Sequence, residues 1–70
     1  MIIEIGIVAG EIWQLLDKHE SLRIGEINEK LKRPEYLVLM SLGWLSREGH
    51  IVINWKETEP YKEHKITLRK

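Results

Sequence analysis

The sequence offers few side chains that could carry out chemistry. It contains no cysteine, which excludes a disulfide framework and a thiolate metal site. His50 and His64 could lie across a hairpin from one another, as a zinc-ligand pair or a pH-sensitive pair would. Their spacing, with His19 as the third imidazole, matches no metal motif. Solvated histidines are therefore the favoured interpretation, and we expect no metal and no cofactor.

Catalytic patterns are also missing. No Ser-His-Asp arrangement, paired carboxylates or phosphate-binding glycine loop stands out in the sequence. A chain of 70 residues has a core that supplies only about 3–5 kcal/mol of net stability. We therefore predict a single domain, residues 1–70, that is not an enzyme and has no evident small-molecule substrate. No apolar run reaches membrane-spanning length and no secretory signal is present, so we expect a cytoplasmic protein without a membrane partner.

Basic residues are the next candidates for a functional site. The chain has 11 basic and 11 acidic side chains and a formal net charge of zero. Nucleic-acid modules more often carry a basic excess. Short basic groups could nevertheless contact phosphates: Lys30, Lys32, Arg33, Lys65, Arg69 and Lys70. The alternative is a solvated lysine surface that keeps a small protein in solution, which the neutral balance favours.

The stretch from Pro34 to Glu48 is a predicted helix with two apolar stripes. Pro34 at its first position and Gly49 just beyond its end are typical helix boundaries. At about 100° per residue, one stripe faces the core and the other faces away from it. The second stripe comprises Tyr36, Leu37, Met40 and Trp44. It could expose on the order of 500 Å², so we predict a dimer or partner interface there. The alternative is that Met40 and Trp44 pack beneath the hairpin or the N-terminal residues of the same chain.

The remaining elements follow from periodicity. Apolar residues at three- and four-residue steps predict an amphipathic helix from Ile5 to His19, and residues 1–5 could form an extended arm or its first turn. Residues 22–24 read as an edge strand and residues 25–31 as a second helix, followed by a tight turn. Alternation after Gly49 predicts a β-hairpin whose tip, residues 57–62, contains Pro60 and is mobile. We expect Trp13 and Trp55 to belong to the core.

The order helix, short strand, helix, helix, hairpin is that of the winged helix. At the level of residues the chain resembles a small prokaryotic family of winged helix-turn-helix proteins of uncharacterised function. The resemblance rests on Ile5-Gly6, Ala9-Gly10, Ile12-Trp13 and Leu16, and on the segment Gly43-Trp44-Leu45-Ser46-Arg47-Glu48-Gly49. It covers nearly the whole chain and implies an α+β fold with a two-stranded β wing. By analogy it implies a role with nucleic acid.

In winged-helix regulators the outer face of the third helix enters the major groove, and the hairpin tip contacts phosphates. The residues that this analogy nominates for DNA, with the preceding turn, are Lys32, Arg33, Tyr36, Arg47, Lys56, Lys62 and Lys65. Base edges present hydrogen-bonding groups, yet on the helix only Arg47 is a good donor. Two functions stay open. One is a homodimeric transcriptional regulator that binds double-stranded DNA, placed first on the family analogy. The other is a dimerisation or protein-interaction module that binds no nucleic acid.

Overall fold

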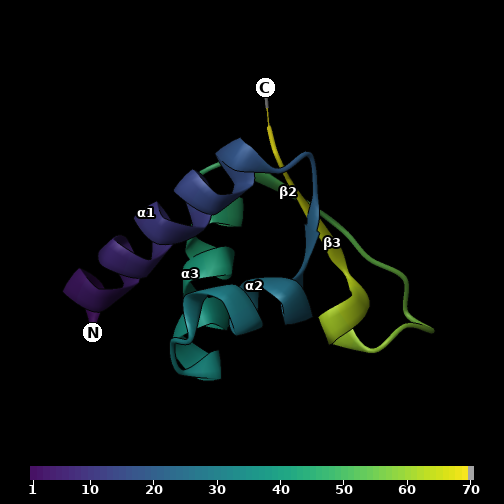
Figure 1. Cartoon of the computed structure of the whole chain (residues 1–70), viewed down its shortest axis with the longest axis horizontal. Coiled ribbons are helices and arrows are strands. Elements are labelled where there is room, and N and C mark those ends of the chain that lie inside the picture. Colours follow the sequence, from purple (N-terminus) through teal and green to yellow (C-terminus); the bar gives the residue numbers. More distant parts are fainter. Residues whose placement is uncertain (70) are drawn as a thin grey trace.

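The computed structural model describes residues 1–69 of the 70-residue chain. Within this range the chain forms three α-helices, three short strands and one 3₁₀ turn, η1 (Figure 1). The elements are α1 (Ile2–Lys18), β1 (Leu22–Arg23), α2 (Ile24–Leu31), α3 (Glu35–Arg47), β2 (Ile51–Asn54), η1 (Tyr61–Glu63) and β3 (Lys65–Leu68). The predicted order of elements is confirmed.

Helix α1 includes nearly all of the N-terminal segment. The amide of Ile5 donates to the carbonyl of Met1 at 3.0 Å, which closes the first helical turn. The Glu4 carboxylate lies 2.8 Å from the N-terminal amine, and this ion pair lowers the pKa of Glu4. Of the two predicted alternatives, the first helical turn is therefore correct and the extended arm is wrong. The N-terminal half of α1 projects away from the sheet (Figure 1).

The helix-turn-helix is held by local hydrogen bonds. The amide of Arg23 donates to the Glu26 carboxylate at 2.9 Å, and this bond from the backbone is the main cause of the lowered pKa of Glu26. Lys32 ends α2 in a left-handed conformation, with φ of 53°. The carbonyl of Pro34 accepts the amides of the first turn of α3. Pro34 is thus the N-cap residue, one residue before α3 begins. The sequence had predicted Pro34 as the first residue of the helix, so the boundary differs by one residue.

The three strands form an antiparallel sheet in the order β1-β3-β2. Leu22 pairs with Ile66, and Ile53 pairs with Ile66 from the other side, so β3 is central and β1 is the predicted edge strand. The hairpin tip contains η1, which packs against the start of α2. A Cβ added to Gly25 would lie 3.4 Å from the Lys62 carbonyl oxygen. The amide of Ile24 donates to the carbonyl of His64 at 3.1 Å, so the end of the loop is hydrogen-bonded to the start of α2. The mobility of residues 57–62 stays a prediction.

The core lies where α1, α2 and α3 meet one face of the sheet. Its buried apolar residues are Val8, Ala9, Ile12, Leu16, Leu22, Ile24, Ile27, Leu37, Val38, Leu42, Leu45, Ile51 and Ile66. Ser41 is fully buried among them. Its hydroxyl donates to the Leu37 carbonyl at 2.8 Å and also lies 3.3 Å from the Ile5 carbonyl, so it joins α3 to α1.

Two tryptophans predicted to belong to the core are exposed instead. Trp13 lies at the edge of α1 that borders α3, where it is only partly covered. Trp55 lies one residue beyond the end of β2, where the ladder no longer holds its side chain against the core. The indole of Trp55 packs only loosely against the His64 ring, with 6.1 Å between ring centroids. Both core predictions are therefore wrong.

Candidate functional site

Helix α3 presents a buried face and an apolar exposed face. Val38, Leu42 and Leu45 are buried against the rest of the chain. On the opposite side Tyr36, Met40 and Trp44 expose 58%, 44% and 47% of their surface. Neither the hairpin nor the N-terminal turn covers them, so these three residues do not complete the core of their own chain.

Leu37 does not belong to the exposed stripe that the sequence predicted. It is 6% exposed and lies in the core. The reason is the position of α1: Leu37 lies one helical turn before Ser41, whose hydroxyl reaches the Ile5 carbonyl of α1. Helix α1 therefore covers this flank of α3, which a helical wheel of α3 alone does not reveal. Leu37 is accordingly removed from the predicted interface.

Helix α1 adds a second set of exposed apolar residues beside Met40 and Trp44. Trp44 lines a groove of about 350 Å³ with Ile2, Ile5 and Gly6. It also lines a neighbouring groove of about 280 Å³, whose wall on the α1 side is formed by Gly6, Ala9, Gly10 and Trp13. The exposed surface of these two helices is referred to below as the α1/α3 face. It is formed by Ile2, Gly6, Gly10, Trp13, Met40 and Trp44. Ile3, Ile7 and Tyr36 are further exposed apolar residues on the same two helices.

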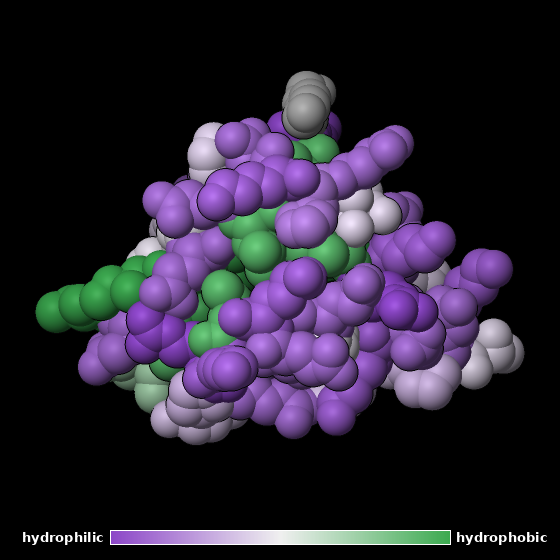
Figure 2. Space-filling model, in the orientation of Figure 1, coloured by the Kyte–Doolittle hydropathy of each residue, from purple (hydrophilic) through white to green (hydrophobic). Residues whose placement is uncertain are grey.

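The contribution of α1 to this face was not predicted, although the sequence carried a signal for it. Residues 2–7 contain four isoleucines, more than one face of a surface helix can bury. Ile2 is 85% exposed. Figure 2 shows an apolar protrusion at the end of the molecule where Figure 1 places the N-terminus, whereas the hairpin end is mostly hydrophilic.

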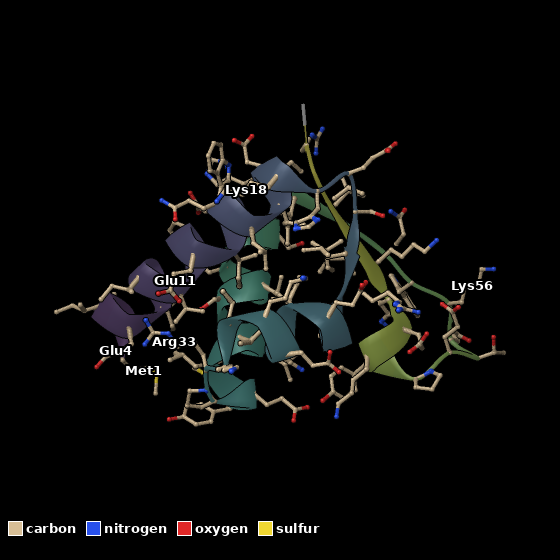
Figure 3. All side chains as sticks on the ribbon, in the orientation of Figure 1. Met1, Glu4, Glu11, Lys18, Arg33 and Lys56 are labelled. Carbon is tan, nitrogen blue, oxygen red and sulfur yellow. The ribbon has the colours of Figure 1, made fainter. Side chains whose placement is uncertain are left out.

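The predicted DNA contact Arg33 is engaged in an ion pair with α1. Its Nε donates to one Glu11 carboxylate oxygen at 3.0 Å and its Nη2 to the other at 2.6 Å. Figure 3 shows the two side chains directed toward each other. These hydrogen bonds lower the pKa of Glu11 and raise that of Arg33. The ion pair therefore joins the turn before α3 to α1, and the Nε and Nη2 atoms of Arg33 already have carboxylate partners.

The other residues nominated for DNA are exposed but dispersed. Lys32 lies in the turn before α3, and Arg47 is the last residue of α3. Lys56 and Lys65 line one cleft of the hairpin together with Glu59 and Glu63. Lys62 lies on η1. Within residues 1–69 none of these side chains forms an ion pair, and they belong to different helices, turns and strands of the chain.

His50 and His64 do not face each other across the hairpin, so the disfavoured alternative of a histidine pair does not apply. The carbonyl of His50 accepts the amide of Arg69 at one end of the β2–β3 ladder. His64 precedes β3 at the other end, beside Trp55, and its buried Nε2 has no hydrogen-bond partner within the described chain. No cluster of three or more potential metal ligands occurs among residues 1–69.

No helix in the described part of the chain has the length and apolar character needed to span a membrane.

Three helices and a β1-β3-β2 sheet, in which β2 and β3 form a hairpin, define a winged helix-turn-helix domain. This is typically a non-enzymatic fold. The sequence model of the family "Winged helix-turn-helix domain (DUF2582)" matches residues 2–68. The chain belongs to this family, as the resemblance predicted. No curated protein and no solved structure shows significant similarity to it.

Proposed function

We propose that the protein functions as a self-associating module and that its α1/α3 face binds a second copy of the chain. The observation that carries this proposal is the continuity of the apolar surface across two helices. Trp44 of α3 shares its groove with Ile2 and Gly6 of α1. The surface that comparable domains turn toward DNA would thus be a protein–protein interface. The proposal assigns no catalytic step to the chain.

The size of the surface supports a dimer. A fully accessible large side chain exposes about 150–250 Å², so the exposed apolar residues of α1 and α3 together present on the order of 800 Å² to solvent. The largest apolar patch on a typical monomer is about 300–600 Å². A stable interface buries about 800 Å² on each partner. The apolar surface exposed on α1 and α3 is therefore large for a monomer and similar in size to one half of a stable dimer interface.

The chemistry of α3 also favours protein over DNA as the occupant. Base edges are recognised by hydrogen bonds from Arg, Lys, Asn or Gln. The exposed face of α3 presents Tyr36, Met40 and Trp44, and its charged residues are Glu35 and Arg47. Apolar and aromatic side chains with few charges are typical of the centre of a protein interface.

Sedimentation equilibrium of two tryptophan variants tests this proposal. Trp44 and Trp55 are 47% and 58% exposed, so Trp55→Glu is a matched control for Trp44→Glu. We expect a dimer for the wild type and for Trp55→Glu, and a folded monomer for Trp44→Glu. Circular dichroism verifies that each variant is folded. A monomeric wild type at high micromolar concentration, or a dimeric Trp44→Glu variant, would contradict the proposal.

A second candidate is a homodimeric DNA-binding regulator, which the family's architecture supports. Lysines outside the α1/α3 face, among them Lys30, Lys32, Lys56 and Lys65, have no ion-pair partner within residues 1–69. They could contact phosphates while the α1/α3 face holds the dimer. Titration of random duplex DNA at increasing salt tests this, because log K falls with a slope of about −0.9 per phosphate neutralised. Absence of binding at ~50 mM salt would discard this candidate.

A further inference from the structure

Two glycines in the middle of the α1/α3 face make no close contact within their own protomer. Gly6 and Gly10 lie one helical turn apart on α1. A Cβ added to either would meet no atom within 4 Å. Glycine inside a helix is less favourable than alanine by about 1 kcal/mol. Close packing within the described chain therefore does not explain why α1 carries glycine at these two positions.

Gly6 and Gly10 leave a shallow channel between two tryptophans. Both glycines line the groove that Trp13 and Trp44 border. Without side chains at these positions, the backbone of α1 is directly accessible there. Packed helices usually lie 8–10 Å apart because their side chains separate the axes. Small residues allow a closer approach, so this channel can accommodate a second helix.

We propose that α1 of the second copy fills this channel and that two α1 helices cross in antiparallel orientation at Gly6 and Gly10. This inference rests on the self-association proposed above. A twofold axis makes each copy use the same surface. If the axis passes beside the midpoint of the two glycines, Gly6 of one copy lies opposite Gly10 of the other. Ile3 then lies opposite Trp13 of the other copy, which brings the most exposed apolar turn of α1 onto an exposed indole.

The charges on this side of α1 agree with the antiparallel crossing. Asp17 lies on the same side of the helix as Gly6 and Gly10, seven residues after Gly10. In the antiparallel register its carboxylate approaches the N-terminal end of α1 of the other copy. The N-terminus of a helix carries a partial positive charge, which attracts a carboxylate. A parallel crossing would instead place the two Asp17 carboxylates near each other.

Cysteine cross-linking measures the register directly. The sequence contains no cysteine, so a single introduced thiol is unique. We expect a mixture of the Gly6→Cys and Gly10→Cys variants to form the mixed disulfide faster than either variant links to itself. Faster linking of each variant with itself, at both positions, would indicate a parallel crossing and overturn the inference. Linking no faster than that of Thr58→Cys, at the exposed hairpin tip, would also overturn it.

Glycine substitution tests the close approach independently. Gly10→Leu should weaken the dimer by about 10-fold or more, because an inserted side chain separates the two helices. Thr58→Leu is the control, since Thr58 is exposed at the hairpin tip, away from the α1/α3 face. We expect the dimer dissociation constant of Thr58→Leu to stay within about twofold of the wild type. Equal dissociation constants for the Gly10→Leu and Thr58→Leu variants would overturn the crossing at α1. If Trp44→Glu still abolished association, self-association itself would stand.

Discussion

Two exposed tryptophans at opposite ends of the molecule have similar accessibility and different surroundings. Trp44 lies at the α1/α3 end and shares a groove with Ile2, Ile5 and Gly6. Trp55 lies on the hairpin, in a cleft that it shares with two lysines and two glutamates. The first indole extends an apolar surface, whereas the second is isolated among charges. Exposure alone therefore does not identify an interface; the neighbouring side chains do.

This difference separates two regions that act together in DNA-binding domains of this shape. There the third helix and the hairpin contact the same duplex. In this protein the outer face of α3 is apolar and continuous with α1, and the hairpin end is hydrophilic (Figure 2). We infer that the two ends meet different partners, a second copy at α1/α3 and solvent or phosphate at the hairpin.

The largest expected effect is on the free energy of unfolding, when a residue on the buried face of α3 is compared with one on its exposed face. Leu42→Ala should cost about 2–5 kcal/mol, because it removes a buried side chain and leaves a cavity. Met40→Ala, on the exposed face, should change the stability of the protomer by less than about 0.5 kcal/mol. Urea denaturation in the Trp44→Glu background compares monomer with monomer. Similar losses for the two variants would mean that the outer face is part of the core.

A smaller effect should follow from removing the other aromatic residue of the α1/α3 face. Trp13→Ala should weaken the dimer by about 30-fold, the loss typical of a central aromatic residue in an interface. Trp55→Ala should leave the dimer dissociation constant unchanged. Dilution calorimetry of both variants provides the measurement. The roles of α1 and the hairpin would be reversed if only Trp55→Ala weakened the dimer.

The junction between the two helices can be tested at Ser41. Ser41→Ala removes the buried hydroxyl that donates to the Leu37 carbonyl and approaches the Ile5 carbonyl. We expect a loss of about 0.5–1.5 kcal/mol in the free energy of unfolding. Hydrogen exchange at the first turns of α1 should rise as well. An unchanged exchange rate there would show that the hydroxyl does not help to hold α1 on α3.

The smallest effect is expected at the ion pair between Glu11 and Arg33. Hydrogen bonds from Arg33 hold the pKa of Glu11 below its ordinary value of 4.5. A carboxyl group with a lowered pKa in the folded state stabilises the fold fully above its unfolded-state pKa, and this contribution disappears as pH falls through the folded-state value. Glu11→Gln should therefore lower Tm slightly at neutral pH and low salt.

The same variant should have a Tm equal to that of the wild type in acid, once Glu11 is protonated in both states. Thermal melts of Glu11→Gln, Arg33→Gln and the double variant across this pH range measure the coupling. Additive effects at neutral pH would show that the two side chains do not stabilise each other.

Local patterns predicted most of the fold, because helix periodicity and strand alternation depend on neighbours in the sequence. The edge strand and the turn at Pro34 are examples. Interactions between distant segments were not predictable. Glu11 and Arg33 are 22 residues apart, and nothing in their local sequence pairs them. The periodicity of α3 alone predicted that Leu37 is exposed. It is buried because α1 packs over it.

The candidate site was half predictable for the same reason. The helical wheel of α3 predicted that Met40 and Trp44 face away from the core, and both side chains are exposed. The adjoining surface of α1 requires the relative position of two helices, and that position is fixed by the shared core. Trp55 lies beyond the last paired residue of its strand, a boundary that alternation does not locate.

The most direct measurement of the central claim is an isotope-filtered nuclear Overhauser experiment on a mixture of labelled and unlabelled protein. It detects contacts between copies only. We predict intermolecular signals between the indole protons of Trp13 and Trp44 and the methyl groups of Ile2 and Ile3. Intermolecular signals confined to the hairpin, or the absence of any such signal at millimolar concentration, would contradict the account.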